Sequence, residues 1–196
     1  MLVVDLELSG IDPSVHGILS IGAVDFIDPE RQFYGECKLR EGAHVMEEAL
    51  EINGFTEDDI NDPEKESEEF LLKSFMTWIE ESENHTLAGH NVHLDLYFLE
   101  NGLHRAGMDS PLARRVMDLH SVCLFHMLMK GLEPPIKNGR SDLNSDTVME
   151  YVGMPAEPRP HIALNGALWE AEAFSRLIEN EGIFEEFEDH PVPWVR

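Results

Sequence analysis

An acidic pair with one residue between its members stands near the start of the chain, in LVVDLELSG. In a β-strand, Asp5 and Glu7 would point to the same face, because alternate side chains share a side. Two neighbouring carboxylates raise each other's pKa unless a cation lies between them. A solvated strand face also explains such a pattern. The opposite face, with Val4, Leu6 and Leu8, is apolar and predicts a strand covered on both sides, where free carboxylates are costly. The pair therefore indicates a cation site.

Two later segments carry further candidates. In GHNVHLDLYFLENG, Asn91, Asp95 and Phe98 would fall on adjacent turns of a helix, so that Asp95 faces a cleft while Phe98 anchors the helix. His161 directly precedes the last predicted helix. Taken alone, each of these residues is better explained by a solvated side chain. The histidines show no pair at the helical spacing of a zinc site, so zinc is not predicted.

Composition limits the kinds of partner. The 196 residues fit one domain with a substantial core. Lys and Arg number 14 against 39 Asp and Glu, which gives a formal net charge of -25. Such a surface repels a long polyanion, because nucleic-acid affinity normally depends on basic residues that neutralise phosphates. Any bound nucleic acid should be short, held through metal ions, or met by a local basic patch. Solubility or a salty environment also explains the acidity.

Cysteine content and hydropathy favour a cytoplasmic protein. Cys37 and Cys123 are far apart in the sequence and show no metal-binding spacing, so reduced, buried thiols are expected. No apolar run approaches the ~20 residues of a membrane helix, and the opening MLVVDLELSG lacks the basic start of a signal peptide. We therefore expect no membrane association.

The elements that must position these residues follow from hydrophobic periodicity. Residues 2–8, 17–27 and 32–39 predict three consecutive antiparallel strands. Two short strands are expected in residues 85–91 and 114–119. Helices are expected at 65–82, 93–107, 120–130, 141–154 and 163–180, with a loop at 131–141. The helix at 65–82 would place Phe70, Leu71, Phe75, Trp78 and Ile79 on one stripe, and Ser141 and Asp142 would cap the helix that follows the loop. This order predicts an α/β fold with a mixed five-stranded sheet flanked by helices.

In this order, the segments resemble the DEDDh (DnaQ-like) 3′–5′ exonucleases. DLELSG resembles the first motif D-x-E-x-[ST]-G of that family, HNVHLDLYFL the second, H-N-x-x-x-D-x-x-F-L, and HIALNGALWEAEAF the third, H-x-A-L-x-D-A. The family includes the proofreading subunit of bacterial DNA polymerase III, ribonuclease T and oligoribonuclease. The resemblance covers residues 2–180 and implies a ribonuclease H-like fold. We expect an exonuclease domain over residues 1–182 and a C-terminal tail over residues 183–196.

The resemblance implies two-metal phosphodiester hydrolysis with Mg²⁺ or Mn²⁺ ions about 3.5–4 Å apart. Asp5 would bridge both ions, and Glu7 would bind the ion that holds the nucleophilic water. Asp95 would support the second ion, and His161 would accept the proton of that water.

The resemblance also implies a set of substrate contacts. The backbone around Leu8 and Ser9 would hold the terminal nucleotide, with Leu8 against its base, and Asn91 would contribute to substrate binding. The implied partner is a short nucleic acid with a free 3′ end, or nucleotides.

One position departs from the family. Gly166 stands where the third motif has an acidic residue, which implies weaker binding of the nucleophile-side ion, or one ion in place of two. Glu170, one turn later on the same helix face, could reach this space as a metal ligand, whereas Asn165 points about 100° away. Two functions remain open: a 3′–5′ exonuclease acting on short RNA or single-stranded DNA, and an impaired relative that binds nucleotides or a protein partner. Relatives include dimers, and the apolar CLFHMLM segment is a candidate for a homodimer interface, although core packing also explains it.

Overall fold

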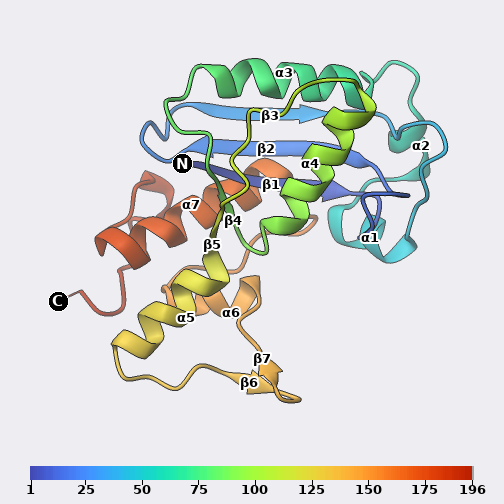
Figure 1. The fold of residues 1–196 in the computed structure, drawn as a ribbon. Helices are drawn as coiled ribbons and strands as arrows, with labels where there is room; N and C mark the ends of the chain where they lie inside the picture. Colours follow the sequence, from blue (N-terminus) through green and yellow to red (C-terminus); the bar gives the residue numbers. More distant parts are fainter. Residues whose placement is uncertain (196) are drawn as a thin grey trace.

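The sheet is mixed and five-stranded, as the sequence predicts. The computed structural model describes residues 1–195. Strands β1 to β5 lie in the order β3-β2-β1-β4-β5, with β1 antiparallel to β2 and parallel to β4 (Figure 1). Their bounds are Leu2–Leu8, Ile18–Asp25, Gln32–Glu36, Leu87–Gly89 and Met117–Asp118. The central position of β1 places the acidic pair in the middle of the sheet.

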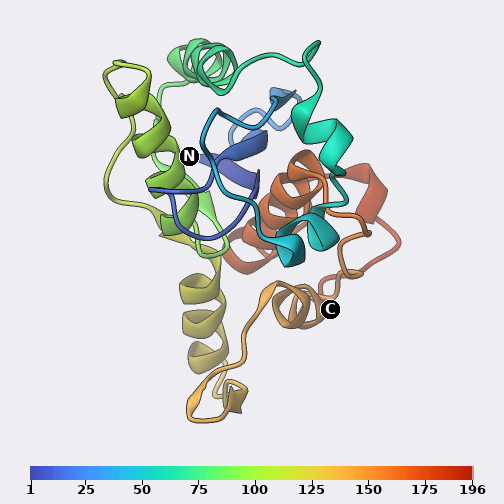
Figure 2. The same cartoon turned by 90° about the vertical axis from the view of Figure 1, so that its right-hand side faces the viewer.

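Helices cover both faces of this sheet. Helices α3 and α4 share one buried cluster with Leu2, Val4 and Leu6, whereas α5, α6 and α7 share a second cluster with Val3. Figure 2 shows α5 extending away from the sheet while α7 lies against it. The helix bounds are Glu47–Asn53 (α1), Glu57–Asn61 (α2), Glu68–Glu80 (α3), His93–Arg105 (α4), Leu119–Met129 (α5), Ser145–Tyr151 (α6) and Ala163–Glu179 (α7).

A glycine on β2 sets how closely α7 approaches the sheet. Gly22 pairs with Asp5 across β1 and β2. A Cβ atom at Gly22 would overlap the backbone of Ala163 and Leu164 at the start of α7. Only glycine permits this approach, which brings the first turns of α7 directly over Asp5.

The predicted loop at 131–141 is wrong in one part, because it contains a short hairpin. Strands β6 (Ile136–Lys137) and β7 (Arg140–Ser141) pair antiparallel across Asn138 and Gly139. Both turn residues have positive φ, 53° and 75°, and an Asn-Gly pair favours this two-residue hairpin turn. The predicted caps of α6 are also wrong: the side chain of Asn144 caps the helix by accepting the N–H of Thr147.

Two helix assignments also change. Phe70 is 52% exposed and does not belong to the buried stripe of α3, which instead includes Leu72 and Met76. Asn91 lies before α4 with a φ of 57°. Asn91 therefore does not share a helix face with Asp95.

The C-terminal segment packs on α7. A 3-10 helix, η1, spans Glu185–Phe187, and Phe187 is buried. Glu172 on α7 accepts the N–H groups of Ile183 and Phe184 at 2.8 and 3.1 Å. The predicted tail thus contacts the main body over its described residues, and Arg196 lies outside them. None of the helices described in residues 1–195 is both long and apolar enough to cross a membrane.

Candidate active site

Three segments far apart in the sequence bring carboxylates together on the α7 side of β1. Asp5 and Glu7 come from β1, Asp95 from the first turn of α4, and Glu170 from α7. Glu7, Asp95 and Glu170 are 7%, 7% and 6% exposed. The pKa of Asp5 is raised well above its ordinary value, first by burial and then by the charges of Glu170, Glu7 and Asp95. These four side chains therefore form one acidic cluster.

The other members of the cluster have raised pKa values as well. Burial, followed by the charges of Glu157 and Asp95, raises the pKa of Glu7 to about 8. Burial raises the pKa of Asp95 to about 7, although the backbone N–H groups near Asp95 and Leu6 favour its ionised form. Carboxylates this crowded cannot all ionise without a cation between them.

Gly166 faces Asp5 across a very small gap. An ideal Cβ at Gly166 would overlap Oδ2 of Asp5 and would lie 2.7 Å from Asp5 Cγ. The Asp5 carboxylate therefore already fills the space that a side chain at position 166 would enter. The position that departs from the family pattern is in direct contact with the predicted bridging ligand.

Glu170 lies beside Asp5, on the side of β4. Its Oε2 has no hydrogen-bond partner and lies 3.1 Å from the point where a Cβ at Gly89 would be. Burial and the charge of Asp95 raise the pKa of Glu170 well above its ordinary value. The structure thus brings Glu170 to the cluster, next to Gly89 on β4, as a metal-ligand role would require.

His161 is held at the edge of the cluster by the loop that precedes α7. Its N–H donates to the carbonyl of Ile52 at 3.2 Å. The imidazole lines a hollow of about 210 Å³ together with Tyr34, Asn53 and Lys65. Burial, and then the charge of Arg159, lowers the pKa of His161 below its ordinary value of 6.5. A neutral imidazole at neutral pH is suited to accept a proton.

Glu157 also belongs to this region, and sequence analysis missed it. Its carboxylate lies 3.8 Å from Nδ1 of His161, and its side chain is only 10% exposed. Burial raises the pKa of Glu157 to about 7. Glu157 lies between prolines in PAEPRPH, and the pattern there indicates only a loop. The only feature of the sequence that could have indicated Glu157 as a site residue is its position four residues before His161.

The predicted substrate contacts differ in accessibility. Leu8 is partly exposed at the end of β1, whereas Ser9 is fully buried. The Ser9 hydroxyl donates to the carbonyl of His44 at 2.8 Å and accepts the N–H of Gly17 at 2.9 Å, and the Ser9 N–H donates to the carbonyl of Gly17. Ser9 therefore holds the loop in place, and the predicted contact between its backbone and a nucleotide is not supported. Asn91 is exposed, and its N–H donates to Oδ2 of Asp118 at 2.9 Å.

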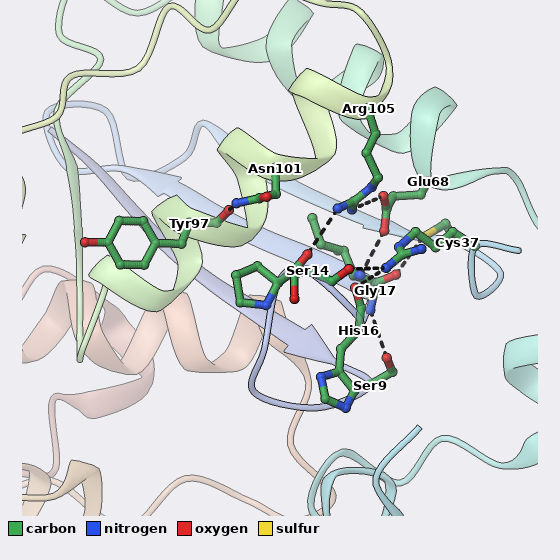
Figure 3. A network of polar contacts seen from close by, with 12 residues as sticks. Ser9, Ser14, His16, Gly17, Cys37, Glu68, Tyr97, Asn101 and Arg105 are labelled. Carbon is green, nitrogen blue, oxygen red and sulfur yellow. Dashed lines mark hydrogen bonds and ion pairs between the residues drawn. The ribbon is translucent and has the colours of Figure 1, made fainter. Parts of the chain in front are cut away.

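A polar network keeps the loop after Leu8 in position. Figure 3 shows Arg105 on α4 and Glu68 on α3 reaching this loop. Arg105 donates to Glu68 at 2.6 Å and to the carbonyl of Pro13 at 3.2 Å, and Glu68 accepts the N–H of Ile18 at 3.1 Å. The edge of the site beside Leu8 is thus fixed by both helices of the opposite layer.

The chemistry of the cluster fits a hard divalent ion. All of its donors are carboxylates, the ligands that Mg²⁺ and Mn²⁺ prefer. Oε1 of Glu157 and Oε2 of Glu170 are buried without partners. Within residues 1–195, no three His, Cys, Asp or Glu side chains are already arranged around one ion position. Binding therefore requires side-chain rotation within the cluster.

Comparison with known proteins links this arrangement to nucleases. Residues 2–174 match the family model RNase_T, described as exonuclease. The chain is 27% identical over 179 residues to the PolC-type DNA polymerase III of Thermotoga petrophila. The aligned region covers 91% of this chain but only 12% of the polymerase. It is 25% identical over 181 residues to the 3′-5′ DNA exonuclease Cap18 of Escherichia coli, covering 90% of the chain and 89% of that protein.

Solved structures share the fold. The nuclease domain of 3′hExo, a DEDDh family member bound to rAMP, superposes with a TM-score of 0.70 at 16% identity, covering 92% of each chain. Escherichia coli Exonuclease I in complex with a dA16 oligonucleotide superposes with a TM-score of 0.71 at 18% identity, covering 92% of this chain and 40% of that one. These likenesses confirm the predicted ribonuclease H-like architecture.

Proposed function

Because the chain belongs to the RNase_T exonuclease family, we propose that it removes nucleotides from the 3′ ends of short RNA or single-stranded DNA with divalent metal ions. The observation that carries this proposal is the convergence of Asp5, Glu7 and Asp95 from two distant segments, all with raised pKa values. Such perturbed carboxylates mark a functional site. The net charge of -25 favours short substrates over long ones.

Different residues of the chain would have different roles in hydrolysis. Asp5, Glu7 and Asp95 would hold Mg²⁺ or Mn²⁺ ions, which supply positive charge at the scissile phosphate and lower the pKa of a bound water. His161, neutral because of its lowered pKa, would accept the proton of the attacking water. Leu8, partly exposed at the strand end, would pack against the terminal base. The loop held by Ser9, Arg105 and Glu68 would keep Leu8 in place.

A nuclease assay tests this function. Purified protein is incubated with Mn²⁺ and a 5′-labelled 12-nucleotide RNA or single-stranded DNA. Single-nucleotide shortening from the 3′ end is expected, together with complete loss of activity in excess chelator. Asp5→Asn should lower the rate at least 100-fold, because it removes a direct metal ligand. A 60-nucleotide substrate should be cleaved more slowly, and a circular strand should stay intact.

Comparison with Gly166→Asp separates the proposed exonuclease from an impaired relative. Restoring the acidic residue requires the Asp5 carboxylate to turn out of the space it fills. Clear wild-type cleavage, with no more than a tenfold gain in Gly166→Asp, is the expected result. Cleavage by Gly166→Asp alone would contradict the proposal. Nucleotide binding without cleavage by either protein would also contradict it and would favour the impaired relative.

A further inference from the structure

Gly166 leaves the Glu7 side of the cluster without the carboxylate that the family motif places there. The Asp5 carboxylate occupies the adjacent space. Glu170, the substitute that the sequence suggests, acts most strongly on Asp5 and faces Gly89 on β4. The Glu7 side of the site therefore needs a carboxylate from a different segment.

We propose that Glu157, on the loop between α6 and α7, is the carboxylate that completes the metal-ligand set beside Glu7. The assignment rests on the proposed metal-dependent function and adds a ligand that the family motifs do not contain. Glu157 enters the site from a loop, whereas the acidic residue of the motif would come from α7. It would bind the ion nearest to His161.

The burial of Glu157 is the first observation in favour. Its side chain is 10% exposed, and its Oε1 has no hydrogen-bond partner. Leaving a charged oxygen buried and unpaired is costly. The contact with His161 at 3.8 Å is an ion pair only when the imidazole is protonated, and the pKa of His161 is lowered. A divalent ion would satisfy Oε1 of Glu157, the oxygen that has no partner.

The second observation is the position of Glu157 relative to Glu7 and His161. Of the charges that raise the pKa of Glu7, that of Glu157 is the largest, ahead of Asp95. Glu157 also acts on Asp5 and Glu170, but less strongly than Asp95 does. Ser20, which pairs with Glu7 across β1 and β2, lines the same hollow as His161. Because the Glu157 carboxylate lies 3.8 Å from Nδ1 of His161, Glu157 lies at the Glu7 end of the cluster.

Nearby cations do not explain the position of Glu157. The backbone N–H of Ile162 and the charge of Arg159 lower the pKa of Glu157, but each acts less than burial does, and Arg159 is exposed. Asp146, the other charge that acts on Glu157, is itself acidic. A buried carboxylate with an acidic neighbour and a weak cationic one is suited to receive a cation from solution.

The loop holds Glu157 in place from both sides. Nε1 of Trp169 on α7 donates to the carbonyl of Pro155 at 3.1 Å. On the other side, the N–H of His161 donates to the carbonyl of Ile52 in α1. Fixed supports of this kind keep a ligand within the narrow tolerance that a metal site demands.

Mn²⁺ binding without substrate tests the assignment. Free Mn²⁺ is measured by electron paramagnetic resonance during titration of the full chain. Glu157→Gln should weaken Mn²⁺ binding at least tenfold, since loss of supporting partners alone costs about 10–100-fold. Asp146→Asn, a matched loss of one nearby exposed charge, should stay within twofold. Glu170→Gln should change the affinity by less than Glu157→Gln does.

Wild-type affinity in Glu157→Gln would overturn the proposal, as would an absence of Mn²⁺ binding by the wild type. Thermal unfolding in chelator provides the folding control: Glu157→Gln should be at least as stable as the wild type, and lower stability would indicate a structural role instead. Glu157→Asp, which keeps the charge, should bind Mn²⁺ more tightly than Glu157→Gln. Because no step uses nucleic acid, an inactive wild type would refute the nuclease function and leave this result intact.

Discussion

The carboxylate of Asp5 lies in the space that a side chain at position 166 would occupy, and its Cγ is 2.7 Å from the ideal Cβ position at Gly166. Asp5 comes from the central strand and Gly166 from the second turn of α7. The close approach of α7 at Gly22 creates this contact. A change at position 166 therefore acts first on Asp5.

Gly166→Ala should disturb metal binding more than it disturbs the fold. Alanine in place of glycine within a helix normally adds about 0.5–1 kcal/mol of stability. Here the new methyl group would push the Asp5 carboxylate aside, and an off-rotamer side chain costs about 0.5–1.5 kcal/mol. We expect the melting temperature in chelator to change little, while Mn²⁺ affinity falls at least tenfold. Thermal unfolding and Mn²⁺ titration measure the two effects.

Gly102→Ala is the matched control for this variant. Gly102 is also a helical glycine, and its Cβ would overlap the end of Leu72, at 2.7 Å, while Arg105 and Glu68 lie at ordinary contact distance, 3.7 Å. Its replacement should leave Mn²⁺ affinity within twofold. If Gly166→Ala keeps wild-type affinity, Asp5 does not act as a metal ligand in the arrangement described above.

Gly22→Ala should destabilise the protein by displacing the start of α7. The added methyl group would overlap backbone atoms of Ala163 and Leu164, and backbone cannot turn aside as a side chain can. Overpacking of this kind costs about 1–3 kcal/mol. Urea unfolding should show this loss. Gly35→Ala, which on neighbouring β3 meets the Leu71 side-chain end, should cost less. Equal losses would contradict the close-approach argument.

Local sequence patterns predict the layers of this fold because burial follows their periods. Alternation in β1 separates Asp5 from Val4, and the two residues lie on opposite faces in the structure. The same reasoning placed Phe70 on the buried stripe wrongly, because adjacent apolar residues on a helix leave two stripes possible and tertiary contacts choose between them. The hairpin at Asn138 and Gly139 could have been predicted from the sequence, since Asn-Gly is a strong turn signal.

The residues of the candidate site also fall into two groups, those that the sequence predicts and those that depend on tertiary contacts. Asp5, Glu7 and His161 stand in motifs of fixed spacing, so a sequence pattern finds them. Glu157 lies in a proline-rich loop without periodicity, and its burial depends on the contacts of that loop with α1 and α7. Sequence alone could not show that the hydroxyl of Ser9 would hydrogen-bond to the backbone of His44 and Gly17, because these partners depend on tertiary packing.

Ser9→Ala should loosen the loop that follows β1. The change leaves the carbonyl of His44 and the N–H of Gly17 without their partner inside the protein, and an unsatisfied buried group costs about 1–3 kcal/mol. Urea unfolding should report that loss, and hydrogen exchange at the Gly17 amide should accelerate. Ser14→Ala removes an exposed hydroxyl that donates to Asp12 at 2.7 Å, and it should stay within about 0.5 kcal/mol of the wild type. Similar costs for the two variants would refute the anchoring role.

The metal-free protein should lose stability as pH rises from about 5 to 8. In the unfolded chain, carboxylates ionise near their ordinary pKa values. In the native state, the pKa values of Glu7, Asp95 and Glu157 are about 8, 7 and 7. The native protein therefore binds more protons than the unfolded chain across this window, and its free energy of unfolding falls with rising pH. The lowered pKa values of His90, His126 and His161 act in the opposite direction. The five carboxyls with raised pKa values, which include Asp5 and Glu170, outnumber these three histidines. Melting temperatures in chelator from pH 5.5 to 8.5 measure the slope.

Two further measurements, one on Glu7→Gln and one with Mg²⁺, test whether the acidic cluster causes this loss of stability with rising pH. Glu7→Gln removes a titrating carboxyl with a native pKa of about 8, so the fall in melting temperature between pH 5.5 and 8.5 should become smaller. Mg²⁺ competes with protons for the same oxygens, so its stabilising effect should be larger at pH 8 than at pH 5.5. A melting temperature that rises over this range in chelator, or a Mg²⁺ effect independent of pH, would mean that the carboxylates are already ionised in the native protein and that no cation is needed to hold them together.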